Sequence, residues 1–593
     1  MSFRADAPFA LIDGDDGSAH LLTDYRRQQV SVSADERGAA PAVLFAGIET
    51  ASAAGEWVVL AADYGLGASF EVAARNPEGD RKSLRAWFFG RCQALDAQQV
   101  DELLSCAQEG LPEHLCRAGV AELRATLAES DYAHKVEQIK AWITDGDCYQ
   151  INLTFPLDFR VYGHPLALYA ALRKRQPVRY GAYVAVPEAV ILSHSPELFF
   201  QRSAARVTTR PMKGTAPRGA TPQYDVALRE AMLASEKERA ENVMIVDLLR
   251  NDLGRLAAPG DVRVDALCAA EAYPTLWQQV STVSAALPHA SLADLFVALF
   301  PCGSITGAPK IRAMRRIAEL ESAARNLYTG ALGWVAPTGD CRFNVAIRTF
   351  EVDHDGSARL GVGSGIVIDA DPAREYAECL LKARFLTGFD PGFELIETMR
   401  LEHGRFPMQS SHLDRLKNSA RALGFALDER AVATALTTQV HEHPVGVFRV
   451  RLSLAHSGAF KLAVAELDEP VCNWRVVIAE ESLPANDYLR AHKTTVRGRY
   501  DAVLGRLAED VFDAIFLNEQ GEVCEGARSN VFIVRDGQWL TPSLKCGLLP
   551  GVMRRSLLDS GRAIEQVLYR EDLLSAEKIY LANALRGVIP VRF

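Results

Sequence analysis

The sequence has 593 residues, of which 48% are apolar and 24% are charged, a composition typical of globular proteins. Its length exceeds what one hydrophobic core serves, so we expect several domains. The net charge of −10 and the lack of any Lys/Arg-rich run argue against nucleic-acid binding. No apolar stretch reaches the roughly 18 residues of a membrane span, and the N-terminus lacks the pattern of a signal peptide. The eleven cysteines are scattered without a CxxC pair, so we expect a soluble, cytoplasmic protein with reduced thiols.

The first half mixes predicted helices and strands. Apolar residues spaced by three and four predict a mostly helical stretch over Leu103–Trp142. The segment Thr387–Gly392, rich in turn formers, interrupts the pattern before a new strand begins at Phe393. We place the main boundary there, with a first domain at 1–388, whose residues 1–110 carry no assigned role, and a second at 393–593. The other predicted elements are strands at Tyr183–Val186, Leu198–Gln201 and Arg206–Thr208, and helices at Leu228–Leu249, Ala293–Phe300, Lys310–Glu321 and Glu375–Leu386.

One lysine lies in a segment dense in turn formers, Arg210–Gly219, and two acidic motifs flank it in the sequence. Glu197 begins an apolar strand within Ser195–Phe200. The stretch Glu238–Arg255 places acidic and amide side chains at the ends of an apolar helix. An isolated loop lysine is ordinarily a solvated surface charge. The two acidic motifs instead favour a chemical role for Lys213.

These motifs resemble those of the chorismate-utilising enzymes, which include anthranilate synthase, isochorismate synthase and component I of aminodeoxychorismate synthase. The resemblance covers roughly residues 110–386. It implies an α+β domain whose antiparallel sheets are sandwiched and flanked by helices. Four further motifs carry the resemblance: Gly303–Lys310, Asn344–Thr349, Gly363–Val367 and Glu375–Glu378.

The resemblance also implies that the substrate is the dicarboxylate chorismate, bound with Mg²⁺. Glu241 and Glu378 match the family's metal ligands, and carboxylate oxygens suit Mg²⁺. The metal would bind one substrate carboxylate, and backbone N–H groups of a glycine-rich strand would bind the other. The matching substrate-binding positions are Gly214, Thr215, Tyr328, Arg348, Gly363, Ser364 and Gly365.

Lys213 narrows the expected reaction. Anthranilate and isochorismate synthases that resemble this motif usually have alanine here, whereas aminodeoxychorismate synthases of the lysine type use the amine as a nucleophile. The resemblance implies that Lys213 adds to the ring and expels the 4-hydroxyl, and that ammonia then enters at that carbon and displaces the lysine. Glu197 would be the general acid for the departing hydroxyl. An anthranilate synthase-like reaction stays open as an alternative.

Two features of the first half bear on how it would work. Gln278 stands where related sequences often have histidine, which puts any histidine-dependent step in doubt. The sequence shows no glutaminase motif. We therefore expect ammonia to come from solution or from a separate glutamine amidotransferase subunit.

The second half contains a second set of motifs around another lysine. His412–Leu416 begins a predicted helix, and its Arg415 could bind a phosphate. Lys493 follows a predicted helical stretch, and Glu525–Phe532 leads into a strand. Gly551 directly precedes a predicted helix, whose N-terminal N–H groups favour an anion.

Together these motifs resemble the fold-type IV pyridoxal-phosphate enzymes, which have two small α/β subdomains with the cofactor between them. The resemblance implies that Lys493 binds pyridoxal 5′-phosphate covalently and later acts as a base. Glu525 would pair with the pyridinium nitrogen. Arg415 and the backbone of Val552 and Met553 would hold the phosphate. The remaining cofactor-binding positions are Ser529, Asn530, Asn583 and Ala584.

This family contains both lyases and aminotransferases, so the fold alone does not decide the reaction. The pair Glu397–Thr398 and the segment Asn583–Val588 look more like those of aminodeoxychorismate lyase, in which Thr398 would protonate the departing enolpyruvate. An aminase joined to a lyase that consumes its product would convert chorismate to 4-aminobenzoate for folate synthesis. A branched-chain or D-amino-acid aminotransferase is the alternative for the second half.

The second domain is also the expected site of assembly. Fold-type IV enzymes are usually dimers with sites completed across the interface, so we expect a homodimer. Arg449 and Arg451 alternate on one face of a predicted strand, where they could bind a substrate carboxylate or serve the structure. A regulatory or scaffolding role for either half is disfavoured because both lysine-centred motifs are intact.

Overall fold

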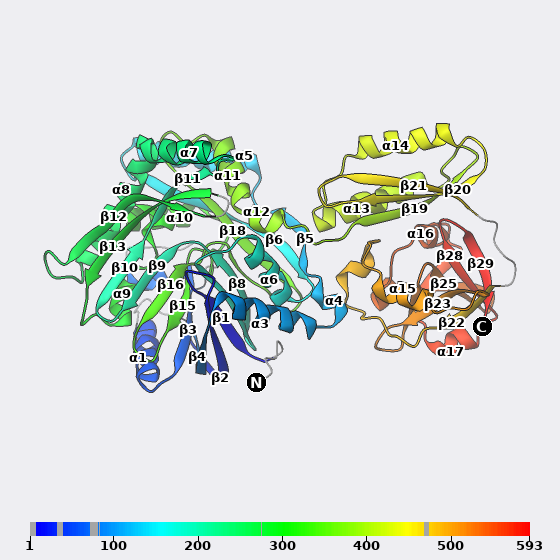
Figure 1. Ribbon diagram of the computed structural model, residues 1–593, viewed down its shortest axis with the longest axis horizontal. Coiled ribbons are helices and arrows are strands. Elements are labelled where there is room, and N and C mark those ends of the chain that lie inside the picture. The colour runs from blue at the N-terminus through cyan, green and yellow to red at the C-terminus, as the bar shows by residue number, and fades with distance from the viewer. Residues whose placement is uncertain (1–6, 33–38, 72–80, 82, 274–275, 468–473) are drawn as a thin grey trace. The chain divides into compact units, whose positions relative to one another are not determined.

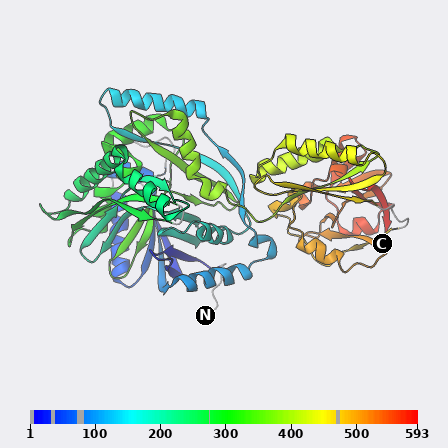
Figure 2. The ribbon, with the colours of Figure 1, turned by 45° about the horizontal axis from the view of Figure 1, so that its top comes forward.

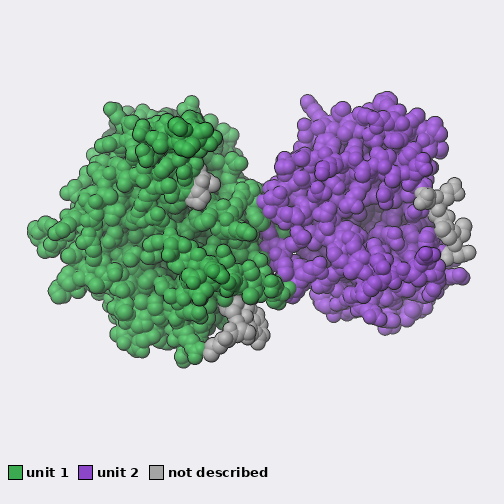
Figure 3. All heavy atoms as spheres, in the orientation of Figure 1, with its two compact units in different colours: residues 1–111, 123–389 green, residues 112–122, 390–593 purple. Residues whose placement is uncertain are grey.

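The computed structural model describes residues 7–32, 39–71, 81, 83–273, 276–467 and 474–593. The chain divides into two compact units, shown in different colours in Figure 3. Unit 1 consists of residues 1–111 and 123–389, and unit 2 of residues 112–122 and 390–593. Residues 112–122 thus group with the second unit, although the sequence analysis assigns them to the first domain. Within the described residues, no helix is long and apolar enough to cross a bilayer.

Unit 1 is built on a 14-stranded sheet in the order β11-β13-β10-β9-β16-β15-β3-β4-β2-β1-β7-β8-β17, with β12 beside β13 (Figure 1). Its neighbouring strands run antiparallel. The strands are β1 (Phe9–Asp13), β2 (Ala19–Val32), β3 (Trp57–Ala62), β4 (Ser83–Leu95), β7 (Tyr180–Val186), β8 (Ala189–Ser195), β9 (Leu198–Ser203), β10 (Arg206–Arg210), β11 (Met212–Pro217), β12 (Val262–Ala272), β13 (Leu276–Ala286), β15 (Ala331–Val335), β16 (Cys341–Val345) and β17 (Thr349–Glu351).

The large sheet is covered on both faces, as β3 illustrates. Successive side chains of a strand point to opposite faces of the sheet. Val58 and Leu60 pack into one hydrophobic cluster, and Val59 and Ala61 pack into another. All four are fully buried, which explains why this strand has no polar alternation in its sequence.

A smaller sheet carries the glycine-rich strand of the predicted site. It has the order β14-β6-β18, with β5 also beside β6, and β18 is therefore an edge strand. The helices α5 and α11 pack on β18 and on one another (Figure 2). The strands are β5 (Gly119–Ala125), β6 (Gln150–Tyr162), β14 (Gly307–Ala308) and β18 (Ser357–Ile366), and the helices of unit 1 are α1 (Ala39–Ala53), η1 (Tyr64–Leu66), α2 (Gly67–Phe70), α3 (Ala97–Glu109), α5 (Glu129–Thr144), α6 (Pro165–Arg175), α7 (Pro222–Ala234), α8 (Glu236–Gly254), α9 (Leu292–Leu299), η2 (Gly303–Ile305), α10 (Lys310–Leu320), α11 (Pro372–Lys382) and α12 (Arg384–Thr387).

Unit 2 contains two sheets. A three-stranded antiparallel sheet has the order β19-β20-β21, and an eight-stranded mixed sheet has the order β24-β23-β22-β29-β28-β25-β26-β27. The smaller sheet comprises β19 (Leu395–Glu402), β20 (Val447–Leu454) and β21 (Phe460–Glu466); the larger comprises β22 (Trp474–Ile478), β23 (Val511–Leu517), β24 (Val523–Gly526), β25 (Asn530–Arg535), β26 (Gln538–Pro542), β27 (Ala563–Gln566), β28 (Lys578–Asn583) and β29 (Gly587–Arg592); the helices are α4 (Glu113–Cys116), α13 (Gln409–Leu423), α14 (Glu429–Glu442), η3 (Tyr488–Ala491), α15 (Gly498–Leu504), η4 (Leu544–Cys546), α16 (Val552–Asp559) and α17 (Arg570–Leu574).

These sheets and helices confirm the predicted fold class and most of the predicted elements. The stretch Leu103–Trp142, predicted to be mostly helical, contains parts of α3, α4 and α5, and the strand β5 lies between α4 and α5. The helix predicted over Leu228–Leu249 is two helices, α7 and α8. They meet at Ser235, whose side chain caps α8 by accepting a hydrogen bond from the N–H of Glu238. A serine that caps one helix favours ending the preceding one.

Candidate functional site

Lys213 lies on β11, opposite the glycine-rich strand β18. A Cβ atom placed on Gly365 would lie 3.6 Å from the Nζ of Lys213. The next residue, Gly214, has a φ of +81°, which favours glycine, and a Cβ there would lie 3.1 Å from a carboxylate oxygen of Glu238. The structure thus brings Lys213, β18 and the start of α8 together, although they are far apart in the sequence.

Glu197 is the buried carboxyl group of this site, with 5% of its surface exposed. Its Oε1 accepts a hydrogen bond of 2.7 Å from the hydroxyl of Ser304. Burial raises the pKa of Glu197 to about 6, while Ser304 and the nearby charge of Lys213 partly oppose that shift. A carboxyl group with this pKa is partly protonated near neutral pH, as a general acid requires.

Four carboxylates from α8 and α11 form an acidic cluster beside Lys213. Burial, and then the charge of Glu241, raise the pKa of Glu238, and Glu378 adds to the shift. Burial likewise raises the pKa of Glu375, which accepts a hydrogen bond from Ser364. The predicted metal ligands Glu241 and Glu378 therefore belong to one cluster. Among the described residues, no set of three or more His, Cys, Asp or Glu has the geometry of a closed metal site.

The predicted substrate-binding residues on β18 are fixed by their neighbours. The carbonyl of Gly363 accepts a hydrogen bond of 2.9 Å from Lys382, which also pairs with Glu378 at 2.9 Å. Gly365 has no room for a side chain, because a Cβ there would collide with the amide of Gln150. Among the described residues, Gly363 to Gly365 pair with β6 on one edge of β18, so the other edge of this stretch can present backbone N–H groups to an anion.

Tyr328 and Arg348, the predicted side-chain donors, are both partly buried. The ring of Tyr328 lies against Gly361 of β18, where a Cβ would collide with it. Arg348 has a φ of +51°, uncommon for a residue with a side chain. Burial lowers the pKa of Arg348, and a buried cation of this kind is stabilised by a bound anion.

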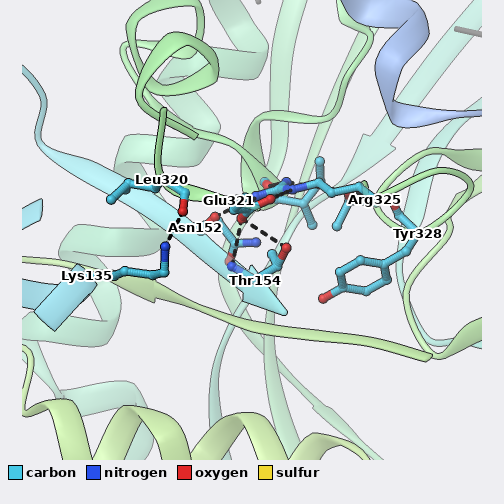
Figure 4. A network of polar contacts seen from close by, with 9 residues as sticks. Lys135, Asn152, Thr154, Leu320, Glu321, Arg325 and Tyr328 are labelled. Atoms are coloured by element: carbon cyan, nitrogen blue, oxygen red, sulfur yellow. Dashed lines mark hydrogen bonds and ion pairs between the residues drawn. The ribbon is translucent and has the colours of Figure 1, made fainter. Parts of the chain in front are cut away.

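A buried ion pair anchors the chain next to Tyr328 (Figure 4). Arg325 donates to both carboxylate oxygens of Glu321, at 2.8 and 2.7 Å, and to the carbonyl of Asn152 at 2.7 Å. The same carboxylate accepts the backbone N–H of Thr154 at 2.8 Å. Lys135 donates to the carbonyl of Leu320. This network joins β6 to the segment that presents Tyr328.

Gln278, which stands where a histidine is common, contacts the lysine-bearing strand directly. Its amide donates to the carbonyl of Gly214 at 2.8 Å, and its Oε1 accepts from Thr215 at 3.0 Å. The segment after Lys213 is therefore held by a side chain that can donate and accept at once. The sequence motif marks the position of Gln278, but it does not predict the hydrogen bonds to Gly214 and Thr215.

Other polar residues of this region have no motif signal. Gln150, Gln279 and Asn242 are buried, and each has a side-chain polar atom without a hydrogen-bond partner among the described residues. A Cβ on Gly214 would lie 3.3 Å from the Oε1 of Gln279. Such buried amide groups ordinarily find a partner, so this part of the site suits a polar ligand.

In unit 2, the predicted residues around Lys493 surround one cavity of about 500 Å³. Both subdomains contribute to its wall, β19 and α13 from one and the larger sheet from the other. Met553 is absent from the wall, because its side chain packs beside the cluster around Phe532. The predicted residues that line the cavity are Thr398, Arg415, Lys493, Glu525, Ser529, Asn530, Val552, Asn583 and Ala584.

Lys493 is tuned by its surroundings. Burial lowers the pKa of its amine from 10.5 to about 8, and the charge of Arg415 acts in the same direction. The backbone carbonyl of Lys493 accepts the N–H of Ile396 at 2.8 Å. This bond ties the lysine to the smaller sheet, next to Thr398. An amine with a lowered pKa is more often neutral and so can act as a nucleophile or base.

Glu525 is held by two hydrogen bonds that fix its carboxylate. The hydroxyl of Tyr500 donates to one oxygen at 2.7 Å, and the N–H of Leu549 donates to the other at 3.0 Å. Glu525 is 6% exposed. The sequence motifs do not predict a role for Tyr500. Its position seven residues after Lys493 is the signal in the sequence that could have indicated one.

Arg415 forms a bidentate ion pair that sequence analysis did not anticipate. Its Nε and one terminal nitrogen donate to Glu397 at 2.8 and 2.6 Å. His412 contacts the same carboxylate at 2.6 Å. Arg415 and His412 lower the pKa of Glu397 to about 2 despite its burial. Part of the guanidinium stays available for an anion, because arginine has five N–H donors.

The start of α16 has the features of an anion site. Gly551 precedes it, and no side chain caps the helix. A Cβ on Gly551 would collide with Asn530, whose amide donates to the carbonyl of Leu549 at 3.0 Å. Ser529 is oriented by a 2.6 Å hydrogen bond to Asp513. The N–H groups of Val552 and Met553 are therefore open to a ligand.

The two regions match two families of proteins. Residues 17–388 match the family of chorismate binding enzymes, and residues 394–592 match the family of class IV amino-transferases. The first match begins at residue 17, so it includes strands for which the sequence motifs gave no assignment.

Curated relatives align with the first region. The chain is 42% identical over 256 residues to aminodeoxychorismate synthase component 1 of Klebsiella aerogenes, covering 43% of this chain and 56% of that protein. It is 42% identical over 313 residues to the protein of the same name from Bacillus subtilis, covering 51% and 66%. An anthranilate synthase component 1 of Haloarcula marismortui is 39% identical over 305 residues, covering 51% and 61%. The chain thus spans between about half and two thirds of these relatives' lengths.

Solved structures resemble the same region. Anthranilate synthase component I from Streptococcus pneumoniae is 26% identical, with a TM-score of 0.51, and covers 65% of this chain and 93% of its own. The isochorismate synthase MenF from Escherichia coli shares the fold at 17% identity, with a TM-score of 0.50 and coverage of 64% and 87%. The chain therefore belongs to the family of chorismate binding enzymes and carries, after that region, a class IV amino-transferase domain.

Proposed function

We propose that this chain converts chorismate and ammonia to 4-aminobenzoate in two steps, one in each unit. The first step would yield 4-amino-4-deoxychorismate and water, and the second would yield 4-aminobenzoate and pyruvate. The observation that carries the proposal is that each lysine lies near side chains that could act with it in acid–base chemistry. Lys213 lies near the partly protonated Glu197, and Lys493 shares a cavity with Thr398 and Glu525.

In the first step, Lys213 would attack the ring as its 4-hydroxyl departs as water. Glu197 would supply the proton for that departure, since its raised pKa keeps part of it protonated. Ammonia would then form the new bond at the same carbon, and the bond to Lys213 would break. Arg348, Tyr328 and the N–H groups of β18 would hold a carboxylate of the substrate.

The acidic cluster fits a divalent cation. Glu238 and Glu375 have raised pKa values in part because Glu241 and Glu378 are close to them. A bound Mg²⁺ would relieve this repulsion and would supply positive charge for a carboxylate of the substrate. Glu241 and Glu378 would hold it, although Glu378 also pairs with Lys382.

The cavity of unit 2 fits pyridoxal phosphate. The uncapped start of α16 and the remaining donors of Arg415 suit its phosphate, and the fixed carboxylate of Glu525 suits its pyridinium nitrogen. When bound, this cofactor withdraws electrons from the substrate carbon that carries the amine. The amine of Lys493 would remove the ring proton, and the hydroxyl of Thr398 would protonate the departing enolpyruvate.

The names of the relatives support this assignment in part. Two proteins that share 42% identity with the first region are named aminodeoxychorismate synthase component 1. We infer that ammonia comes from a separate glutamine amidotransferase or from solution. A homodimer through unit 2 stays a prediction, which sedimentation of the purified protein would test.

The test is a Lys213→Ala variant supplied with chorismate, Mg²⁺ and an ammonium salt. We expect formation of 4-amino-4-deoxychorismate to fall by about 10³-fold or more, with no change in the second step when that intermediate is added directly. Lys174→Ala, which changes an exposed lysine of α6, is the matched control. Normal amination by Lys213→Ala would overturn the covalent role.

A second candidate exists for the first unit. An anthranilate synthase component is 39% identical to this region, so the ring could instead be aminated at the carbon next to the one that bears the carboxylate. The product distinguishes the two, because that reaction yields 2-aminobenzoate. For the second unit, amino transfer to a 2-oxo acid without pyruvate release from the intermediate would favour an aminotransferase.

A further inference from the structure

One short stretch of the chorismate-binding region packs within unit 2. Residues 112–122, here called the α4 segment, lie inside the family match of 17–388 but group with the second unit. Glu113 pairs with Arg499 at 3.5 Å, and Tyr488 donates to Glu122 at 2.9 Å. The segment is thus attached at both of its ends to residues that precede and follow Lys493.

The α4 segment also forms part of the wall of the Lys493 cavity. Glu113, His114 and Arg117 line it together with Lys493 and Thr398. Gly498 makes room for the segment, because a Cβ there would lie 2.5 Å from an oxygen of Glu113. The contact therefore involves close packing between the α4 segment and the chain that follows Lys493.

His114 is one of the wall residues that have a buried side-chain atom without a hydrogen-bond partner among the described residues. Its Nδ1 is shielded from solvent and has no hydrogen-bond partner among the described residues. Burial lowers the pKa of His114, so its ring is neutral near pH 7 and can donate or accept one hydrogen bond. A buried polar atom without a partner is uncommon, and His114 belongs to the wall of a cavity that can hold a ligand.

The cavity as a whole favours an anion. Eight arginines line it against four acidic residues. The phosphate expected at the start of α16 would account for part of this positive charge. Arg117, on the α4 segment, and Arg449, on β20, belong to no contact described for that phosphate. Arg117 donates to the carbonyl of Gly392 at 3.1 Å and keeps further N–H donors. Together with Arg449 it can bind a second anionic group, such as a carboxylate of the substrate.

We propose that His114 and Arg117 of the α4 segment are specificity-determining residues of the second site, which bind the carboxylates of its cyclic dicarboxylate substrate. This proposal rests on the proposed function of unit 2. It means that the chorismate-binding region supplies part of the site that consumes its product. Neither residue would take part in bond breaking, so substrate affinity would depend on them more than turnover does.

The experiment uses the full-length protein loaded with pyridoxal phosphate and supplied with 4-amino-4-deoxychorismate, so that the first step is bypassed. We expect His114→Ala and Arg117→Ala each to raise KM about tenfold, with kcat changed by less than about twofold. His114→Gln should restore much of the affinity, since it retains a donor and an acceptor. His441→Ala, an exposed histidine of α14, is the matched control.

Two further readouts separate the possible failures. The absorbance of the lysine-bound cofactor should be the same in all variants, which excludes a general loss of the fold. Unchanged KM in both alanine variants, while the parent protein releases pyruvate, would overturn this inference alone. Failure of the parent protein to release pyruvate would overturn the proposed function of unit 2, and this inference with it.

Discussion

In the two lysine sites, burial shifts the pKa of different kinds of side chain. In unit 1, burial raises the pKa of an acid, Glu197, to about 6. In unit 2, burial lowers the pKa of the amine of Lys493 to about 8. Carboxylates lie near both lysines, but Arg415 and Arg497 also lie near Lys493, where their charges oppose those of Glu397 and Glu525. The same side chain can thus serve two kinds of chemistry, because its charged neighbours differ.

The comparison also fixes opposite pH dependences. The protonated fraction of a carboxyl falls as pH rises through its pKa, so the proposed acid function of Glu197 should decline above about pH 6. An amine with a lowered pKa is neutral above it, so Lys493 becomes a base as pH rises through about 8. Each unit can therefore be disabled separately.

The largest expected effect comes from Lys493→Ala. Loss of the base should reduce pyruvate release by about 10³-fold or more, while amination of chorismate continues. Chromatography should then show 4-amino-4-deoxychorismate accumulating. Lys545→Ala, at an exposed position of the same unit, should behave like the parent protein. Loss of amination in Lys493→Ala would show that the two sites are not separable.

Glu197→Gln should reduce the first step by about 10²-fold or more, because a neutral amide cannot supply the proton for the departing hydroxyl. Single-turnover rates of chorismate amination measure it. In the parent protein these rates should fall as pH rises above about 6, and the variant should lack that decline. A parent profile that is flat between pH 5 and 8 would contradict the assignment of Glu197 as the acid.

The rate at which pyridoxal phosphate attaches to Lys493 should directly reflect the lowered pKa of its amine. Only the neutral amine attacks the aldehyde, so the attachment rate should rise about tenfold for each pH unit below about 8 and level off above it. Absorbance after mixing the apo protein with the cofactor measures this rate. A rate that keeps rising to about pH 10 would mean that Lys493 behaves like an exposed lysine.

Tyr500→Phe should weaken cofactor binding by about tenfold. The variant removes one of the two hydrogen bonds to Glu525, and such a bond to a carboxylate contributes about 1.5 kcal/mol or more. Titration of the apo protein with pyridoxal phosphate measures the loss. Tyr224→Phe, which changes an exposed tyrosine of α7, is the control. Equal affinity in both variants would show that Leu549 alone fixes Glu525.

The sequence predicted those parts of each site that lie in short, contiguous motifs. Such motifs predict Thr398, Lys493, Glu525 and Asn530, which line one cavity; their roles stay predictions. The pairing of Glu397 with Arg415 was not predicted, because it depends on how β19 and α13 pack rather than on residue spacing.

Contacts between segments that are far apart in the chain could not be predicted from the sequence. The strand β5 lies within a stretch whose pattern is mostly helical, and its pairing with β6, rather than its own periodicity, specifies it. His114 lies about 380 positions before Lys493, and no local pattern connects the two. Both residues line one cavity, and only the folded chain brings them there.

Substitution of Gln278 should have the smallest effect, and it should affect the reaction of unit 1 without changing that of unit 2. Gln278 holds the segment after Lys213 through Gly214 and Thr215, so Gln278→Leu should slow amination by about fivefold, the effect of losing roughly 1 kcal/mol of hydrogen bonding. Gln278→His should lose less, since an imidazole retains a donor for the carbonyl of Gly214. Initial rates with chorismate and ammonium measure both variants, and pyruvate release from added intermediate should not change. If Gln278→Leu were as fast as the parent protein, the glutamine would only fill the place of histidine, and the position of Lys213 would depend on the backbone alone.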